Sequence, residues 1–146
     1  MFFGTGGRLR YLAADWREAR LSLGLNPLTR NYVGTIFGGS MFAASDPFLV
    51  LMLHHALGPG YVVWDKAARI RFRRPGRSRL AMTLRLDGEL LREVRATVAA
   101  EHRWTRWLPL RWTDDAGEVV CELERELYVA DADWYATRRG DSAPIH

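Results

Sequence analysis

The chain has 146 residues, of which 48% are hydrophobic and 26% charged, and its formal net charge is +4. This length and apolar content indicate one folded domain, which we expect over residues 1–130, and exclude a disordered chain. The longest apolar run, residues 48–53, is too short to span a bilayer, and no sustained run resembles a signal peptide. We therefore expect a cytoplasmic protein with no membrane partner. The single cysteine, Cys121, excludes an internal disulfide.

The first half of the chain predicts a strand followed by a long helix. Residues 15–25 alternate as a strand does, and Asn26-Pro27 ends the alternation. Residues 38–57 are nearly all apolar and run from a glycine pair to the stop signal Gly58-Pro59-Gly60. A helix that is apolar on nearly every side is wrapped by other structure.

Asp46 is the one carboxylate in that apolar stretch, and Ser45 precedes it. A buried carboxylate without a partner is unfavourable, so such a group is usually paired or retained for chemistry. Asp46-Pro47 is also a good N-cap dipeptide, in which case the helix begins at Pro47 and Asp46 only caps it. The residues alone leave both interpretations open.

Residues 62–72 and 80–86 each alternate as strands, and Arg74-Pro75-Gly76-Arg77 between them predicts a turn, so we expect the two strands to form a hairpin. Trp64 and Ile70 fall on the inward parity of the first strand, and so does Lys66. Lys66 either extends along a sheet edge with its ammonium group in water or pairs with a buried carboxylate.

The last third of the chain predicts a short helix, a hairpin and a tail. Residues 87–103 have apolar residues at helical spacing, with Asp87 available as a cap. Residues 104–113 and 118–129 flank a turn at 114–117 and predict a second hairpin. Residues 131–146 lose all pattern, so we expect a loose C-terminal tail.

These elements predict an α+β architecture in which a five-stranded antiparallel sheet wraps one long central helix, with a short extra helix. A half-wrapped helix leaves one flank and one sheet edge exposed, and pairing of two copies covers both. We therefore expect a homodimer, and two dimers could pair into a tetramer.

Basic residues cluster in and after the strand at residues 62–72. Arginine predominates, and Lys66 is the only lysine. The clustered residues are Arg69, Arg71, Arg73, Arg74, Arg77 and Arg79. Guanidinium groups suit phosphate oxygens, but the cluster lacks the helix or aromatic platform of nucleic-acid-binding modules. It fits a small phosphorylated ligand better than nucleic acid, and a solvated strand face explains the charge equally well.

Residues 31–46, NYVGTIFGGSMFAASD, resemble the motif N-x-x-G-x-x-H-G-G-x-x-x-x-x-x-D of hotdog-fold acyl-CoA thioesterases of the phenylacetyl-CoA type. Five positions match: Asn31, Gly34, Gly38, Gly39 and Asp46. Residues 72–77, FRRPGR, resemble the family's F-x-R-P-x-R turn. The Trp64-Asp65-Lys66 pattern is closer to a less characterised branch of the superfamily.

The resemblance implies a hotdog fold and hydrolysis of acyl-CoA thioesters without a cofactor, coenzyme A being part of the substrate. In the family, a backbone N–H at the glycine pair polarises the thioester carbonyl, a role that falls here to Gly38 or Gly39. The helix carboxylate, contributed across the dimer interface, is general base or nucleophile, which points to Asp46. The arginines of the turn, Arg73, Arg74 and Arg77, would meet the coenzyme A phosphates.

Two positions depart from the family pattern. Phe37 replaces the family's His, and Pro47 removes an N–H directly after Asp46. These departures favour, as an alternative, a non-catalytic hotdog protein that binds acyl-CoA or a fatty acyl chain. A basic turn also suits an acidic acyl-carrier protein as donor. The candidate substrate-binding residues are Asn31, Phe37, Ser45, Lys66, Arg73, Arg74 and Arg77.

Other chemistry finds less support. His54 and His55 are adjacent on the predicted helix and point in different directions, so we expect no metal site. Ser40 and Ser45 lie near the glycine pair without a recognisable histidine to activate either hydroxyl.

Overall fold

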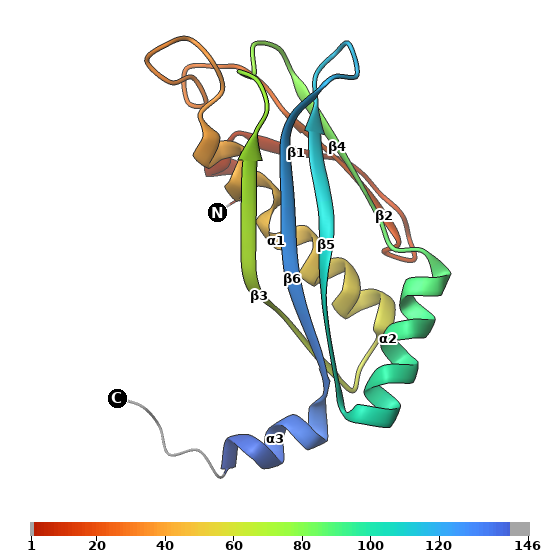
Figure 1. The fold of residues 1–146 in the computed structure, drawn as a ribbon. Coiled ribbons are helices and arrows are strands. Elements are labelled where there is room, and N and C mark those ends of the chain that lie inside the picture. The colour runs from red at the N-terminus through yellow and green to blue at the C-terminus, as the bar shows by residue number, and fades with distance from the viewer. Residues whose placement is uncertain (1, 141–146) are drawn as a thin grey trace.

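The computed structural model describes residues 2–140, which form one antiparallel sheet around a long helix (Figure 1). Within these residues the elements in chain order are η1 (Phe2–Thr5), β1 (Gly7–Leu12), β2 (Glu18–Leu23), α1 (Gly38–Leu57), β3 (Tyr61–Phe72), β4 (Leu80–Arg85), α2 (Gly88–Glu101), β5 (Arg103–Thr113), β6 (Val119–Asp131) and α3 (Ala132–Gly140). The α+β class and the long central helix are confirmed.

The sheet has six strands in the order β1-β2-β4-β5-β6-β3, one more than the sequence predicts. The additional strand is β1, which pairs with β2 and has a register irregularity between Leu9 and Tyr11. Its glycine-rich start and exposed residues lack the alternation that marks a strand. β1 and β3 are therefore the two outer strands of the sheet.

α1 begins at Gly38 and continues through Pro47, so the interpretation of Asp46 as the N-cap of a shorter helix is wrong. A proline inside a helix gives up one hydrogen bond. The burial of apolar side chains after the proline offsets this loss, because Phe48, Leu49, Met52 and Leu53 pack into the core.

The predicted hairpin of β3 with β4 is also wrong. β3 pairs with β6 at the outside of the sheet, whereas β4 lies between β2 and β5. Residues 73–79 form the long connection between these separated strands, and Gly76 within it packs beside Ile36 and Met41. The hairpin of β5 and β6 is confirmed.

A bulge in β3 between Asp65 and Ala67 changes which side chains face the core. One extra residue reverses the two-residue alternation, so Trp64 does not share the inward face of Ile70 as predicted. Trp64 stacks on Tyr128 with ring centroids 4.4 Å apart, and Tyr135 of α3 packs against it.

α3 occupies residues 132–140, where the sequence pattern predicts a loose tail. Its first turn is capped by Asp131, whose Oδ1 accepts a hydrogen bond from the Trp134 N–H at 2.8 Å. None of its residues is buried, which explains why no apolar periodicity marks it in the sequence. Residues 141–146 of the predicted tail lie outside the described part of the chain.

Candidate functional site

The N-terminus of α1 presents free backbone donors. Phe37 is the N-cap residue and makes no side-chain cap bond, while its carbonyl accepts from Ser40 N at 3.0 Å. Within residues 2–140, the N–H groups of Gly38 and Gly39 have no hydrogen-bond partner. Free N–H groups at the positive end of a helix favour an anion or a polarised carbonyl oxygen.

Gly38 lines a hollow of about 400 Å³, here termed the α1 N-terminal hollow. Its lining comes from the loop before α1, the first turn of α1 and the connection after β3: Asn31, Thr35, Ile36, Gly38, Met41, Phe72, Arg73, Arg74, Pro75 and Gly76. The fold thus brings four of the sequence-predicted residues, Asn31, Gly38, Arg73 and Arg74, around one space.

Both glycines at the start of α1 lie against aromatic rings. A Cβ added at Gly38 would lie 2.6 Å from the Phe72 ring of β3, closer than a side-chain contact allows. A Cβ at Gly39 would likewise meet the ring of Phe37. Phe72 and Phe37 are 54% and 57% exposed, so a side chain at either glycine requires a partly exposed ring to shift.

Asn31 organises the loop that leads into the hollow. Its Oδ1 accepts from the N–H groups of Val33 and Thr35, and its Nδ2 donates to Thr35 Oγ1 at 2.9 Å. Because this side chain already has partners within the loop, it shapes the hollow more than it offers groups to a ligand.

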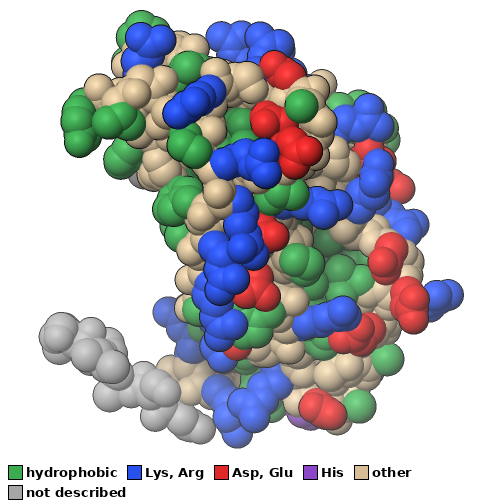
Figure 2. All heavy atoms as spheres, turned by 45° about the horizontal axis from the view of Figure 1, so that its top comes forward, with side chains coloured by type: hydrophobic (Ala, Val, Ile, Leu, Met, Phe, Trp, Pro, Cys, Tyr) green, Lys and Arg blue, Asp and Glu red, His purple; other side chains and the backbone are tan. Residues whose placement is uncertain are grey.

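Two of the three arginines of the predicted phosphate-binding turn are engaged in ion pairs on the surface. Arg73 Nη2 lies 2.7 Å from Glu122 Oε2, and Arg74 Nη2 lies 3.4 Å from Glu118 Oε2. Arg77 has no ion-pair partner within residues 2–140. Exposed pairs contribute little to stability, so a phosphate could replace either glutamate. Figure 2 shows Lys and Arg side chains gathered in a column over the part of this face that β3 occupies in Figure 1.

Asp46 lies in a second group of polar residues, here termed the Asp46 cluster and defined as Asp46, Ser45, Asp65 and Arg125. The Arg125 side chain is 1% exposed, and its Nη1 lies 2.6 Å from Asp46 Oδ1 and 2.9 Å from Asp65 Oδ2. The Asp46 side chain is 59% exposed. The carboxylate therefore has a buried cation on one side and open space on the other.

Two of the predicted substrate-binding residues, Ser45 and Lys66, lie in or near this cluster. Ser45 is fully buried, donates to the Phe42 carbonyl and accepts from Arg125 Nη2, so it does not present its hydroxyl to a substrate. Lys66 is exposed at the β3 bulge with Nζ 6.0 Å from the Tyr128 ring centroid. Arg125, and not Lys66, pairs with the carboxylates of the cluster.

Asp65 is incompletely paired in this cluster. Its Oδ1 is buried and has no hydrogen-bond partner in the described part of the chain. Burial raises the pKa of Asp65 above its usual value of 3.8, Asp46 adds to the rise, and the Arg125 guanidinium opposes it.

Arg125 is the site residue that the sequence analysis missed. It lies in the run Glu122-Leu123-Glu124-Arg125-Glu126, whose glutamates suggest a solvated strand. Its parity is nevertheless that of Leu123 and Leu127, both of which are buried. A cation at an inward position, in a chain with a carboxylate in its apolar helix, is the signal that could have found this pair.

Asp46 and the hollow are separate within one chain. Eight residues of helix divide Gly38 from Asp46, which is about 12 Å along the axis at 1.5 Å per residue. One chain therefore does not bring both groups to the same atom. Asp65 lies on β3, an outer strand of the sheet, so Asp46 is close to an edge that a second chain can reach.

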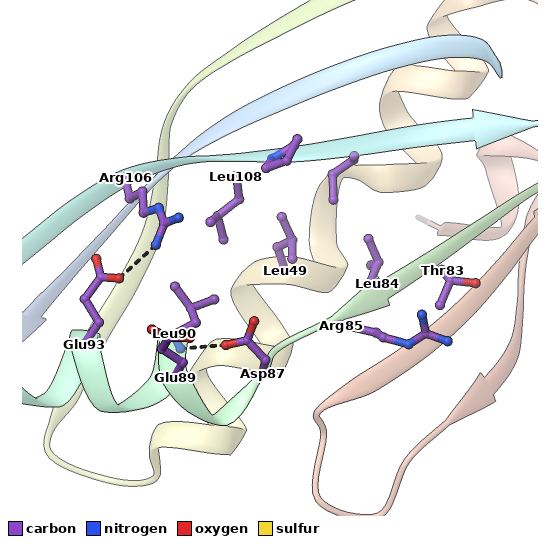
Figure 3. A pocket seen from close by; sticks show the side chains of 12 residues that line it. Leu49, Thr83, Leu84, Arg85, Asp87, Glu89, Leu90, Glu93, Arg106 and Leu108 are labelled. Carbon is purple, nitrogen blue, oxygen red and sulfur yellow. Dashed lines mark hydrogen bonds and ion pairs between the residues drawn. The ribbon is translucent and has the colours of Figure 1, made fainter.

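Two further hollows adjoin the helices. One of about 710 Å³ is largely apolar and lies between β1 and the middle of α1, with Leu9, Pro47, Phe48 and Leu51 in its wall. The other, of about 520 Å³, lies where β4 and β5 separate and α2 crosses the opening; Leu49 of α1 lines it, and Glu93 and Arg106 form an ion pair at one end (Figure 3). The second contains none of the sequence-predicted residues.

The remaining candidates carry little chemistry. Burial raises the pKa of the Cys121 thiol to about 11, and Glu122 adds to the rise, so this cysteine is a poor nucleophile. Within residues 2–140, no group of three or more His, Cys, Asp or Glu side chains is arranged to hold a metal ion. In the same residues, no helix has the length and apolarity needed to span a membrane.

Comparison with solved structures shows a hotdog fold. A Pseudomonas aeruginosa protein of unknown function, described as a probable thioesterase, superposes with a TM-score of 0.78 at 23% identity and covers 87% of this chain and 84% of its own. A Chlorobaculum tepidum protein of unknown function gives 0.73 at 13% identity, covering 88% and 85%. A Haemophilus influenzae thioesterase gives 0.63 at 14%, covering 88% and 81%.

The chain belongs to the family described as domain of unknown function DUF4442, which matches residues 1–129. The search of curated proteins found no match to the chain.

Proposed function

We propose that the protein hydrolyses acyl-CoA thioesters as a homodimer in which each site combines the α1 N-terminal hollow of one chain with Asp46 of the other. The observation that supports this most is the N–H group of Gly38, which has no hydrogen-bond partner within residues 2–140, in a hollow that Arg73 and Arg74 also line. Several structural neighbours are named thioesterases, which agrees with the proposal.

The proposed dimer forms along β3. This outer strand is twelve residues long and lacks a partner on one side within residues 2–140. An unpaired edge of this length favours pairing with a second strand. Pairing of two β3 strands about a twofold axis would bring Asp46, which lies beside Asp65 of β3, toward the α1 N-terminus of the partner.

In the proposed reaction, the thioester carbonyl oxygen accepts hydrogen bonds from the glycine N–H groups, which stabilise the negative charge that develops on it. Asp46 removes a proton from water as the water oxygen attacks the carbonyl carbon. The C–S bond then breaks, and the proton held by Asp46 passes to the departing thiolate. Attack by Asp46 itself, followed by hydrolysis of the anhydride, gives the same products.

The substrate binds through both of its ends in this proposal. The coenzyme A phosphates would meet Arg73, Arg74 and the unpaired Arg77. The acyl group would occupy apolar surface, and the hollow beside Pro47 and Phe48 offers such a surface.

Phe37 supports a second candidate, a non-catalytic protein that binds acyl-CoA. Where the thioesterase motif has a histidine, this exposed phenylalanine can neither donate nor accept a hydrogen bond. Such a protein would bind coenzyme A esters and leave them intact.

Thiol release from short, long and aromatic acyl-CoA substrates tests the proposal, with Asp46→Asn compared against Asp115→Asn, a control in the exposed β5–β6 turn. We expect release by the wild type and the control, and a loss of at least about 100-fold in Asp46→Asn. Binding of acyl-CoA without thiol release would favour the second candidate. Activity in Asp46→Asn equal to that of the wild type would refute the role of Asp46.

Mixing two inactive variants tests the shared site. Asp46→Asn and Gly38→Ala inactivate different halves of it, so half of the dimers formed by random exchange contain one intact site. Activity should return to about a quarter of the wild-type value. No recovery, in a mixture shown by native mass spectrometry to contain mixed dimers, would contradict a site built from two chains.

A further inference from the structure

Arg125 is the most completely buried charged residue of the described chain, and its guanidinium group makes four polar contacts. Nη1 donates to Asp46 Oδ1 at 2.6 Å and to Asp65 Oδ2 at 2.9 Å. Nη2 donates to the Phe42 carbonyl and to Ser45 Oγ, both at 3.0 Å. Removal of a guanidinium ion from water is unfavourable unless its hydrogen bonds are replaced. Two elements, α1 and β3, supply the replacements, while Nε has no hydrogen-bond partner within residues 2–140.

The contacts hold Asp46 from one side only. Arg125 occupies Oδ1, whereas Oδ2 has no hydrogen-bond partner within residues 2–140. The side chain is 59% exposed, so Oδ2 is the oxygen available to a molecule outside the protein. An aspartate on a helix otherwise turns freely about χ1 and χ2, and a fixed Oδ1 leaves Oδ2 with one direction.

The helix backbone on either side of Asp46 is also affected by Arg125. Pro47 supplies no N–H to the helix at the position directly after Asp46. Arg125 Nη2 binds the Phe42 carbonyl one turn before Asp46, and the guanidinium carbon lies 4.8 Å from the centroid of the Phe42 ring. Arg125 therefore fixes the helix on the N-terminal side of the proline as well as the carboxylate.

The cluster contains one cation and two carboxylates. Asp46 comes from α1, Asp65 from β3 and Arg125 from β6, while Lys66 places its ammonium group over Tyr128. Asp65 has a buried Oδ1 without a partner, so Asp65 is the carboxylate that burial disfavours in its ionised form. Of the two carboxylates that Arg125 binds, Asp46 is therefore the exposed one.

We infer that Arg125 is a positioning residue that fixes Asp46 Oδ1 so that Oδ2 faces the reacting water or thioester of the partner chain's hollow. This inference rests on the proposed function, because it assigns Arg125 a role in that same reaction. It extends the site to a residue that does not touch the substrate.

The test compares Arg125→Met and Arg125→Lys with Arg111→Met, the same change at an exposed residue of β5. Arg125→Met should lower kcat by at least about 100-fold with KM changed by less than about threefold, because binding groups remain and the carboxylate loses its orientation. The acidic limb of its kcat profile should move to higher pH, since a cation beside the carboxylates of the cluster is gone. Arg111→Met should match the wild type.

Arg125→Lys separates charge from geometry. Lysine keeps the cation without the planar fork that reaches two carboxylates and two further acceptors, so we expect the wild-type acidic limb with kcat still lowered at least about tenfold. This variant also decides the matter if Arg125→Met does not fold, as judged by circular dichroism and thermal unfolding.

The outcomes distinguish this inference from the proposed function. Loss of activity in Asp46→Asn with a folded Arg125→Met or Arg125→Lys at the wild-type kcat would overturn the role of Arg125 alone. A wild type that releases no thiol from any acyl-CoA, or an active Asp46→Asn, would overturn both. A change confined to unfolding temperature, with kcat and its pH profile unchanged, would make Arg125 a purely structural residue and overturn the inference.

Discussion

The indole N–H of Trp112 donates a hydrogen bond of 2.9 Å to the main-chain carbonyl of Met41, and the Trp112 side chain is fully buried. Trp112 lies on β5 and Met41 in the first turn of α1, three residues after Gly38. This hydrogen bond joins the first turn of α1 to β5.

Trp112→Phe tests that hydrogen bond. It removes the indole N–H and leaves a small cavity, so the free energy of unfolding should fall by about 1–3 kcal/mol. Trp107→Phe on the same strand is the control, because Trp107 contacts Arg69 on the outer face and should cost less than about 1 kcal/mol. Urea unfolding measures both, and equal effects would contradict a special role for Trp112.

Gly38→Ala should destabilise the fold although alanine favours helices. A Cβ at residue 38 meets the Phe72 ring at 2.6 Å, and overpacking of this kind costs about 1–3 kcal/mol. The double change with Phe72→Ala should recover part of that loss. Phe72→Ala alone is the reference for that double change. A Gly38→Ala variant as stable as the wild type would show that Phe72 does not constrain the glycine.

Glu93→Met should lower the free energy of unfolding by about 1–3 kcal/mol, because the Trp104 Nε1–H then lacks its acceptor in a buried position. Glu93 accepts from Trp104 Nε1 at 2.9 Å and from Arg106 at 2.8 Å (Figure 3 shows the second bond). Arg106→Met removes only an exposed ion pair and should cost less than about 1 kcal/mol. Chemical denaturation separates the two, and a cost from Arg106→Met equal to that from Glu93→Met would mean that the tryptophan bond contributes little.

Asp65 should make stability depend on pH in a defined direction. Its pKa is raised by burial in the folded chain above the usual value of 3.8, so the folded state retains the proton more strongly than the unfolded state. The contribution of Asp65 to stability is therefore fully present below the unfolded pKa of 3.8 and declines as the pH rises through the folded pKa. Urea unfolding from pH 3 to 7.5 should show this decline in the wild type relative to Asp65→Asn. A constant difference between the two proteins would show that the pKa is not raised.

The elements with strong local signals could be predicted from the sequence. α1 follows from the apolar run at residues 38–57, and the β5–β6 hairpin follows from its turn at residues 114–117. β1 and α3 could not, because neither buries an apolar face that periodicity can show. The partner of β3 depends on a distant strand, β6, and closeness in sequence wrongly favoured β4.

The part of the candidate site whose residues lie within one short segment could be predicted from the sequence. Asn31 and Gly38 lie in one motif, and the turn with Arg73 and Arg74 reaches them because the sheet places it there. Arg125 lies 79 residues from Asp46 in the chain. No local pattern joins two such positions, although the inward parity of Arg125 marks it as unusual.

The sheet is joined at its centre by one described register pair, Ala81 with Thr113, between β4 and β5. The strands β1, β2 and β4 thus form one ribbon and β5, β6 and β3 another, with α1 and α2 bridging the seam (Figure 1). Amide protection should then fall into two blocks that exchange separately, with the seam as their boundary. Under denaturing conditions the two ribbons would separate at this seam before either unfolds, and α1, which packs against both, would hold them together.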